Sequence, residues 1–244
     1  MSQIADVSRA NRKEPNYFLF ADHSIRILMG AARVENLAAG YDLYCRSKIE
    51  VLRSDHEYSV RSPADRLRRE AASALAELRR TFGFAVKTVG LAAETVVSMG
   101  GLKVMPDLPL SAFVPESADI LILPGGESWT DGEVPQVSEV VRAMVALSRP
   151  VAAICAATLA LAHGGLLDDR LHTSNGKNFI GKYVHEYRGE EFYRASPAVR
   201  DRCVITANGL APFAFAAEIF RALAPERERD IETYEKLYSR GLLD

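Results

Sequence analysis

The sequence predicts an α/β fold, in which a mostly parallel β-sheet carries helices on both of its faces. Two observations point to this class. From about Phe84 onward, short apolar runs alternate with longer stretches of helical spacing. The run ILIL at 120–123 is apolar at every position, as expected of a parallel strand that is buried on both faces. A chain of 244 residues is long enough for one large domain of this class with an appendage.

The individual elements follow in chain order from these patterns. Period-two alternation predicts a strand at 84–89, and continuous apolar runs predict buried strands at 120–123, 151–154 and 204–207. A further short strand is expected at 102–105. Helical spacing predicts helices at 135–147, from Cys155 to about Gly164, at 211–223, and at 225–240. The order of strands and helices is that of an α/β sheet.

The first 69 residues do not share this order. The runs 17–20 and 25–29 are candidate strands. The stretch 53–70 is rich in Arg, Asp and Glu and contains little to bury. One interpretation is an N-terminal extension with a solvated helix at about 64–80; the other is that part of the segment is not ancestral sequence. We therefore divide the chain into an atypical segment 1–69, a main domain 70–224 and a C-terminal helix 225–244. We expect 53–69 to be exposed and the first sheet strand to come from 17–29 or to be missing.

Composition excludes several classes of protein. A hydrophobic fraction of 48% is too high for a disordered chain, and a net charge of −2 provides no basic field for nucleic acid or anionic membrane. No signal-peptide pattern and no run of 18 apolar residues is present, which predicts a cytoplasmic protein without a membrane partner. Cys45, Cys155 and Cys203 stand far apart, so neither a zinc site nor a disulfide framework is indicated.

Cys155 is the strongest candidate for chemistry. The apolar run at 151–154 ends directly at this cysteine, and a run of good helix formers follows it. A strand-to-helix corner of this kind, the nucleophile elbow, presents one side chain at the carboxyl edge of the sheet. A helix N-terminus also favours the thiolate form of a cysteine. The alternative is a small buried cysteine that fills the core, which is also our interpretation of Cys45 and Cys203.

A second motif follows the buried strand at 120–123. Pro124 is followed there by Gly125 and Gly126, whose backbone can approach a ligand and whose amides can stabilise an oxyanion. The alternative is an ordinary tight turn. The sequence lacks the glycine patterns that bind dinucleotides or nucleotide phosphates.

Taken together, these runs resemble the ThiJ/PfpI family of the class I glutamine amidotransferase-like superfamily. The matching runs are ADILILPGG, AAIC with an alanine-rich helix ending in GGLLDDR, HTSN, and ITANGLAPFAFAAEI. They occur in the family's order and spacing, over about residues 70–223. The resemblance implies a flavodoxin-like three-layer sandwich with a cysteine at the nucleophile elbow, assembled as a homodimer.

The resemblance also implies roles for single residues. Cys155 takes the position of the family's nucleophile. Gly125 and Gly126 lie in the loop that faces it, and the amide of Ala156 takes the place of the second oxyanion donor.

Two further catalytic residues follow from the resemblance. The family commonly places a glutamate against the thiol, and Glu70 is the matching carboxylate, although basic residues precede it where the family has an apolar strand and loop. Some members carry a histidine directly after the cysteine, where this chain has Ala156, or in the next strand, where His172 falls. The alternatives are a solvated helix charge for Glu70 and a structural role for His172.

Three functions are compatible with these residues. The first is a cysteine-dependent enzyme, a hydrolase, hydratase or glyoxalase/deglycase-type lyase, that acts on a small carbonyl-like substrate without a metal or organic cofactor. The second is a redox-sensing or stress-response protein in which Cys155 is oxidised reversibly. The third is a glutaminase subunit, which is disfavoured because the required His-x-Glu pair is missing downstream of Cys155. A DNA-binding regulator is not expected, because only about 20 residues follow Leu223 in this sequence.

Overall fold

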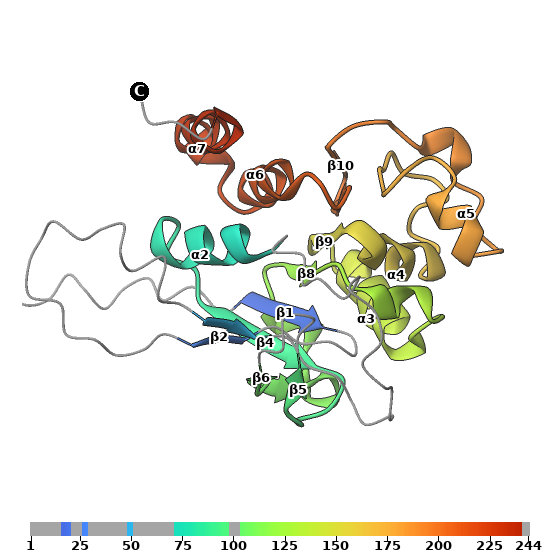
Figure 1. Ribbon diagram of the computed structural model, residues 1–244, viewed down its shortest axis with the longest axis horizontal. Coiled ribbons are helices and arrows are strands. Elements are labelled where there is room, and N and C mark those ends of the chain that lie inside the picture. The colour runs from blue at the N-terminus through green and yellow to red at the C-terminus, as the bar shows by residue number, and fades with distance from the viewer. Residues whose placement is uncertain (1–15, 21–25, 29–47, 51–70, 98–102, 241–244) are drawn as a thin grey trace, which may run out of the picture.

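A computed structural model describes residues 16–20, 26–28, 48–50, 71–97 and 103–240 (Figure 1). Within these residues, seven strands form a sheet in the order β10-β11-β9-β8-β1-β4-β7, and every neighbouring pair is parallel except β10 with β11. The strands of this sheet are β1 (Asn16–Phe20), β4 (Val86–Gly90), β7 (Leu108–Pro109), β8 (Leu121–Leu123), β9 (Val151–Ile154), β10 (Ala198–Asp201) and β11 (Val204–Ala207). The predicted flavodoxin-like α/β sandwich is confirmed.

The first sheet strand comes from the N-terminal segment. β1 lies between β8 and β4, and its residue Phe18 is paired with Ile122 on one side and Thr88 on the other. The central strand is therefore present, and the alternative in which it is missing is wrong. The second stretch that we considered, 25–29, contributes β2 (Arg26–Leu28), which pairs with β3 (Lys48–Glu50) outside the main sheet.

The strand expected at 102–105 also lies outside the main sheet. Only β6 (Lys103–Val104) forms there, and it pairs antiparallel with β5 (Val96–Val97). The adjoining chain returns to the sheet through β7, whose Leu108 is paired with Val89 of β4. A two-residue strand is too short for its sequence pattern to distinguish these two pairings.

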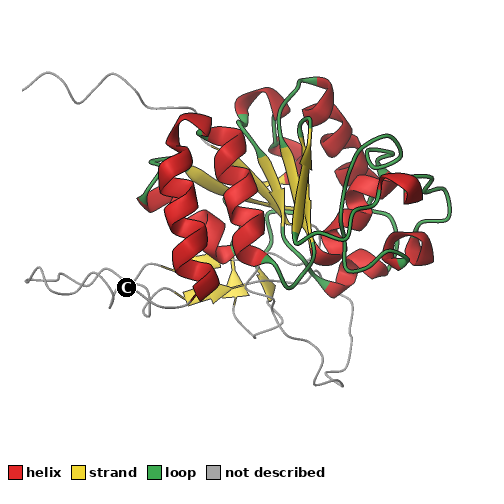
Figure 2. Ribbon diagram, turned by 90° about the horizontal axis from the view of Figure 1, so that it is seen from above, coloured by secondary structure: helices red, strands yellow, loops and turns green. Residues whose placement is uncertain are grey.

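Helices cover both faces of the sheet (Figures 1 and 2). On one face α2 packs beside α6, and α7 packs on α6; α3 and α4 pack together on the opposite face. The α-helices are α2 (Ala72–Arg80), α3 (Pro135–Ala146), α4 (Thr158–His163), α5 (Phe179–Tyr183), α6 (Pro212–Leu223) and α7 (Glu228–Arg240). Short 3₁₀ turns join them: η1 (Leu110–Ala112), η2 (Pro115–Ser117), η3 (Glu127–Thr130), η4 (Cys155–Ala157), η5 (Glu190–Phe192) and η6 (Pro225–Arg227).

The core lies between these helix layers and the middle of the sheet. All residues of β8, β9 and β11 are buried, which explains why their sequences are apolar at nearly every position. Among the described residues, no helix is long and apolar enough to cross a membrane. The expected divisions of the chain at residues 69 and 224 stay predictions, although β1 pairs within the main sheet and α7 packs on α6.

Candidate active site

Cys155 lies at the predicted corner between strand and helix. β9 ends at Ile154, η4 begins at Cys155, and α4 continues the turn from Thr158. The backbone of Cys155 has φ = 61°, in the left-handed region that non-glycine residues rarely adopt. Such a conformation persists only where the surrounding structure enforces it, and it is common at functional sites. The cysteine is 6% exposed, so its thiol is held at the edge of the core.

The thiol receives a hydrogen bond from a residue to which the sequence assigned no role. Nδ2 of Asn175 donates to Sγ of Cys155 over 3.2 Å. The other end of the same amide is also held, because the backbone N–H of Gly209 donates to Oδ1 of Asn175 over 3.0 Å. The amide of Asn175 therefore bridges the cysteine and the turn after β11, with its N–H group directed at the sulfur.

Hydrogen bonds of buried hydroxyl groups connect the elbow to the segment that carries Asn175 and to β11. The hydroxyl of Thr158 donates to the carbonyl oxygen of Cys155 over 2.8 Å and lies 2.7 Å from the hydroxyl of Ser174. The backbone N–H of Thr173 donates to the hydroxyl of Thr206 on β11. The HTSN run thus connects the elbow to the sheet before it reaches Asn175.

His172 lies in the same run but faces other partners. It is fully buried, its Nδ1 lies 2.8 Å from the carbonyl oxygen of Arg170, and its Nε2 lies 2.6 Å from the hydroxyl of Tyr187. A carbonyl only accepts, so we assign the ring proton to Nδ1, and Nε2 then accepts from Tyr187. Burial lowers the pKa of His172, and burial likewise raises the pKa of Tyr187 to about 12. These contacts suit a neutral positioning residue; proton transfer by His172 stays a prediction.

The buried imidazole predicts a pH-dependent stability. The folded state keeps His172 neutral, whereas the unfolded chain takes up a proton near pH 6.5. The contribution of His172 to the unfolding free energy should therefore be constant above that value and fall as the pH drops from it towards the lower pKa of the folded state, by at most about 1.4 kcal/mol per pH unit. Urea unfolding at pH 7.5 and 5.5 measures the loss, and His172→Gln should show a smaller one. An equal loss in both proteins would contradict the assignment.

The two glycines follow the strand next to the elbow. β8 and β9 are parallel neighbours, so Gly125 and Gly126 emerge at the same sheet edge as Cys155. η3, which begins after Gly126, packs against η4. In the described hydrogen bonds neither glycine donates its N–H group, and the amide of Ala156 lies in the first turn of η4, where amides have no partner within the helix. The role of these amides in stabilising an oxyanion stays a prediction.

The other candidate residues from the sequence are Glu70 and the two further cysteines. Glu70 and Cys45 lie outside the described residues, as does the segment 53–69 that we expected to be exposed. Cys203 lies in the turn before β11, where its carbonyl oxygen accepts from the N–H of Val151. Within the described part of the chain, no cluster of three or more His, Cys, Asp or Glu side chains is arranged to hold a metal ion.

The geometry can be compared with known proteins. A model described as the DJ-1/PfpI family matches residues 53–222. The chain belongs to the DJ-1/PfpI family. The predicted membership is thereby confirmed, and the match begins before the expected residue 70. The strand-to-helix corner at Cys155 lies within the part of the chain that matches the family.

Relatives in the DJ-1/PfpI family carry different names. The chain is 40% identical over 138 residues to a Bacillus subtilis protein named uncharacterized protease YoaZ, a match that covers 57% of this chain and only 66% of that relative. It is 27% identical to the Caenorhabditis elegans glutathione-independent glyoxalase DJR-1.2, over 61% of this chain and 79% of the relative. Among solved structures, the DJ-1 superfamily protein Atu0886 from Agrobacterium tumefaciens is 38% identical, with a TM-score of 0.64 over 71% of this chain and 94% of that one.

Proposed function

We propose that this protein is a cysteine-dependent enzyme in which the sulfur of Cys155 adds to the carbonyl carbon of a small substrate. The observation that carries the proposal is the elbow itself: a cysteine held at φ = 61° whose sulfur accepts a hydrogen bond from Asn175. A purely structural cysteine needs neither the strained backbone nor a polar partner. The names of the relatives, protease and glyoxalase, both fit chemistry at a carbonyl carbon.

The proposed first step is covalent addition. The thiolate of Cys155 forms a bond to the carbonyl carbon, and the electron pair of the C=O double bond moves to oxygen. The amides of Gly126 and Ala156 donate hydrogen bonds to this oxyanion. These hydrogen bonds replace those that water would otherwise make to it. With an activated ester, collapse of the intermediate expels the alkoxide and leaves a thioester. Water then cleaves the thioester to the acid and the thiolate, and the proton released in this step neutralises the alkoxide.

The surrounding residues have separate roles in this proposal. Asn175 stabilises the thiolate through its N–H group, while Gly209 fixes the orientation of its amide. His172, with both ring nitrogens engaged, acts as a positioning residue for the segment that carries Asn175. Glu70 is the predicted proton donor for leaving groups that need one.

Covalent trapping and turnover test this function together. The protein is mixed with p-nitrophenyl acetate or with methylglyoxal, quenched with acid, digested and mapped by mass spectrometry. We expect steady turnover of at least one compound and an adduct on the peptide that contains Cys155. An absence of both adduct and turnover, together with ready oxidation of Cys155 by peroxide, would overturn the proposal in favour of the redox-sensing alternative.

A second prediction concerns the reactivity of the thiol. Because a helix start and an amide donor both favour the thiolate, we expect Cys155 to have a pKa below the value of about 8.5 for an unperturbed cysteine. Asn175→Asp replaces the donor by a negative charge and should raise that pKa, slowing alkylation at pH 7 by roughly tenfold. Alkylation rates against pH, with Cys45 and Cys203 changed to serine, report the value.

Asn178 provides the matched control for this experiment. It is exposed, belongs to the same segment and makes no side-chain cap at the start of α5. Asn178→Asp introduces the same charge without removing a donor from the sulfur and should leave the alkylation profile close to that of the wild type. An inflection at or above 8.5 in the wild type, or equal profiles for the two variants, would contradict the role of Asn175.

A further inference from the structure

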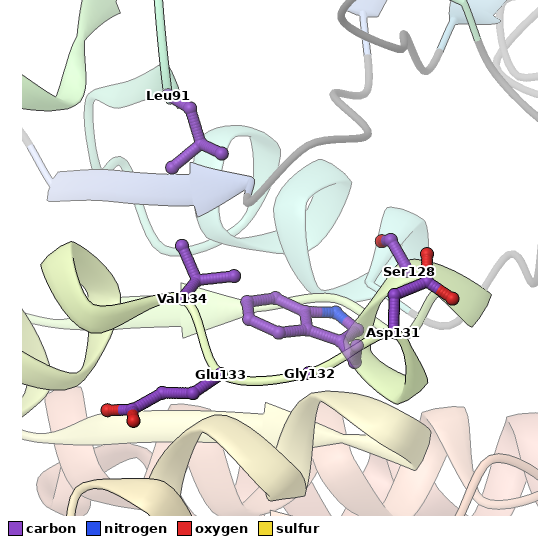
Figure 3. Close-up of a pocket in the computed structure, with 7 residues that line it drawn as sticks. Leu91, Ser128, Asp131, Gly132, Glu133 and Val134 are labelled. Carbon is purple, nitrogen blue, oxygen red and sulfur yellow. The ribbon is translucent and has the colours of Figure 1, made fainter. Parts of the chain in front are cut away.

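A pocket opens beside η3 (Figure 3). It lies at the same edge of the sheet as Cys155, because η3 follows β8, and β8 is the parallel neighbour of the strand that ends directly before Cys155. Its volume is about 190 Å³. It is lined by Leu91, Ser128, Trp129, Asp131, Gly132, Glu133 and Val134. Because η3 also packs against η4, the turn that forms one wall of the pocket is the turn that contacts the cysteine elbow. The pocket is therefore next to the proposed catalytic centre, although Cys155 does not line it.

One part of the pocket is apolar. Leu91 and Val134 face each other across it in Figure 3. Trp129 is 4% exposed, and its indole N–H already donates to the carbonyl oxygen of Pro124 over 3.0 Å, so its side chain has no further donor to offer a ligand. An engineered cavity of about 150 Å³ holds one benzene molecule, so this pocket has room for an apolar body of about that size.

The other part of the pocket is polar and unsatisfied. The hydroxyl of Ser128 is buried, and its oxygen has no hydrogen-bond partner in the described structure. The carboxylate of Asp131 lies beside Ser128 at the same end of the pocket (Figure 3). No ion pair among the described residues includes Asp131, which is exposed. Glu133 extends away from these two residues.

The charge of Asp131 favours one class of ligand among those that could pair with the hydroxyl of Ser128. A hydroxyl can accept from a donor or donate to an acceptor, whereas a carboxylate without a counter-ion attracts positive charge. A primary ammonium group supplies both, since it carries three N–H donors and one positive charge. An anion would be repelled by Asp131, and a purely apolar ligand would leave the hydroxyl of Ser128 unpaired.

We propose that this pocket binds a protonated primary amine, with the ammonium group between Ser128 and Asp131 and an apolar body of about one ring against Leu91, Trp129 and Val134. The inference deepens the proposed function and rests on it for the ligand's identity: the amine is the part of the substrate that lies beside the carbonyl attacked by Cys155. The preferred substrates are then amino esters or amino amides rather than neutral carbonyl compounds.

Trp129 makes the binding directly measurable. It is the single tryptophan of the chain, so its fluorescence reports on this pocket alone. Benzylammonium and benzyl alcohol serve as probes of similar size that differ in charge, with ammonium chloride as the ionic-strength control. We expect benzylammonium to change the emission at a concentration about fivefold lower than benzyl alcohol does, the upper range for an exposed charge pair.

Three variants decide the origin of that preference. Asp131→Asn should abolish the preference for the charged probe, and Ser128→Ala should weaken binding of benzylammonium more than binding of benzyl alcohol. Glu139→Gln on α3 removes another exposed carboxylate, one outside the pocket, and should change neither the preference for the charged probe nor the binding of benzylammonium. Equal binding of the two probes to the wild type, or an unchanged preference in Asp131→Asn, would overturn the proposal.

The Cys155→Ala variant separates this proposal from the proposed function. Because Cys155 does not line the pocket, benzylammonium should bind to this variant as it binds to the wild type. Normal amine binding without any turnover in the wild type would overturn the proposed function and leave the pocket assignment standing. Turnover of p-nitrophenyl acetate without amine binding would overturn the pocket assignment and leave the proposed function standing.

Discussion

Replacing Cys155 by alanine is expected to lower kcat/KM for the carbonyl substrate by about 10³-fold or more, the largest effect of any single change in this chain. The reason is chemical, because alanine cannot form the bond to the carbonyl carbon. Serine at this position should also be nearly inactive, since its hydroxyl ionises much less readily than a thiol. Steady-state turnover of p-nitrophenyl acetate or methylglyoxal measures the loss.

Cys203 supplies the matched control. It is a partly exposed thiol in the turn before β11, and the described contact that it makes with β9 is through its backbone carbonyl. Cys203→Ala should therefore retain wild-type turnover. If Cys155→Ala retains more than a tenth of wild-type activity with unchanged thermal stability, the nucleophile lies elsewhere and the proposed mechanism fails.

Replacing Phe220 by alanine is expected to lower the free energy of unfolding by about 3–5 kcal/mol, the usual cost of removing a buried aromatic ring. Phe220 is fully buried on α6. Its ring stacks on Phe82 at 4.6 Å and meets Tyr234 of α7 edge-on at 5.1 Å. One side chain therefore joins three parts of the outer helix layer, and its loss leaves a cavity where they meet. Urea unfolding at pH 7.5 measures the change.

Phe213 is the matched control on the same helix. It is only half-buried and stacks on Tyr238 at 4.8 Å, so Phe213→Ala should cost less than about half as much as Phe220→Ala. Because neither ring contacts the elbow in the described structure, the rate of thiol alkylation should remain unchanged in both variants. Equal destabilisation by the two substitutions would contradict the central role of Phe220.

Sequence patterns predicted the features that depend only on a residue and its neighbours along the chain. Nearly continuous apolar runs located β8, β9 and β11, because a strand covered on both faces has few polar positions to obscure the pattern. The elbow at Cys155 was located for the same reason, since its signal is a buried strand that ends directly before a run of helix formers. The position of Gly125 and Gly126 at the same sheet edge as Cys155 could also be predicted, because the parallel strands β8 and β9 end at one edge.

The first strand shows the limit of this reasoning. The segment 17–20 was one of two apolar stretches in an otherwise unusual N-terminal region, and nothing local distinguishes a central strand from a peripheral one. β1 takes the central place because it pairs with β8 and β4, which are distant in the sequence. Strand order is a property of these long-range pairings, so the sequence pattern left it open.

The sequence by itself determined the layered α/β architecture, the position of the elbow and the identity of its cysteine, because each depends on short-range apolar pattern and backbone geometry. The tertiary structure alone decided which side chains meet the sulfur. Asn175 is twenty residues from Cys155, and its amide is oriented by Gly209, a further thirty-four residues along the chain. His172, three residues before Asn175, is turned instead toward Tyr187. A polar side chain within such a run can find its partner on any neighbouring element, and only the folded packing selects which hydrogen bonds are made.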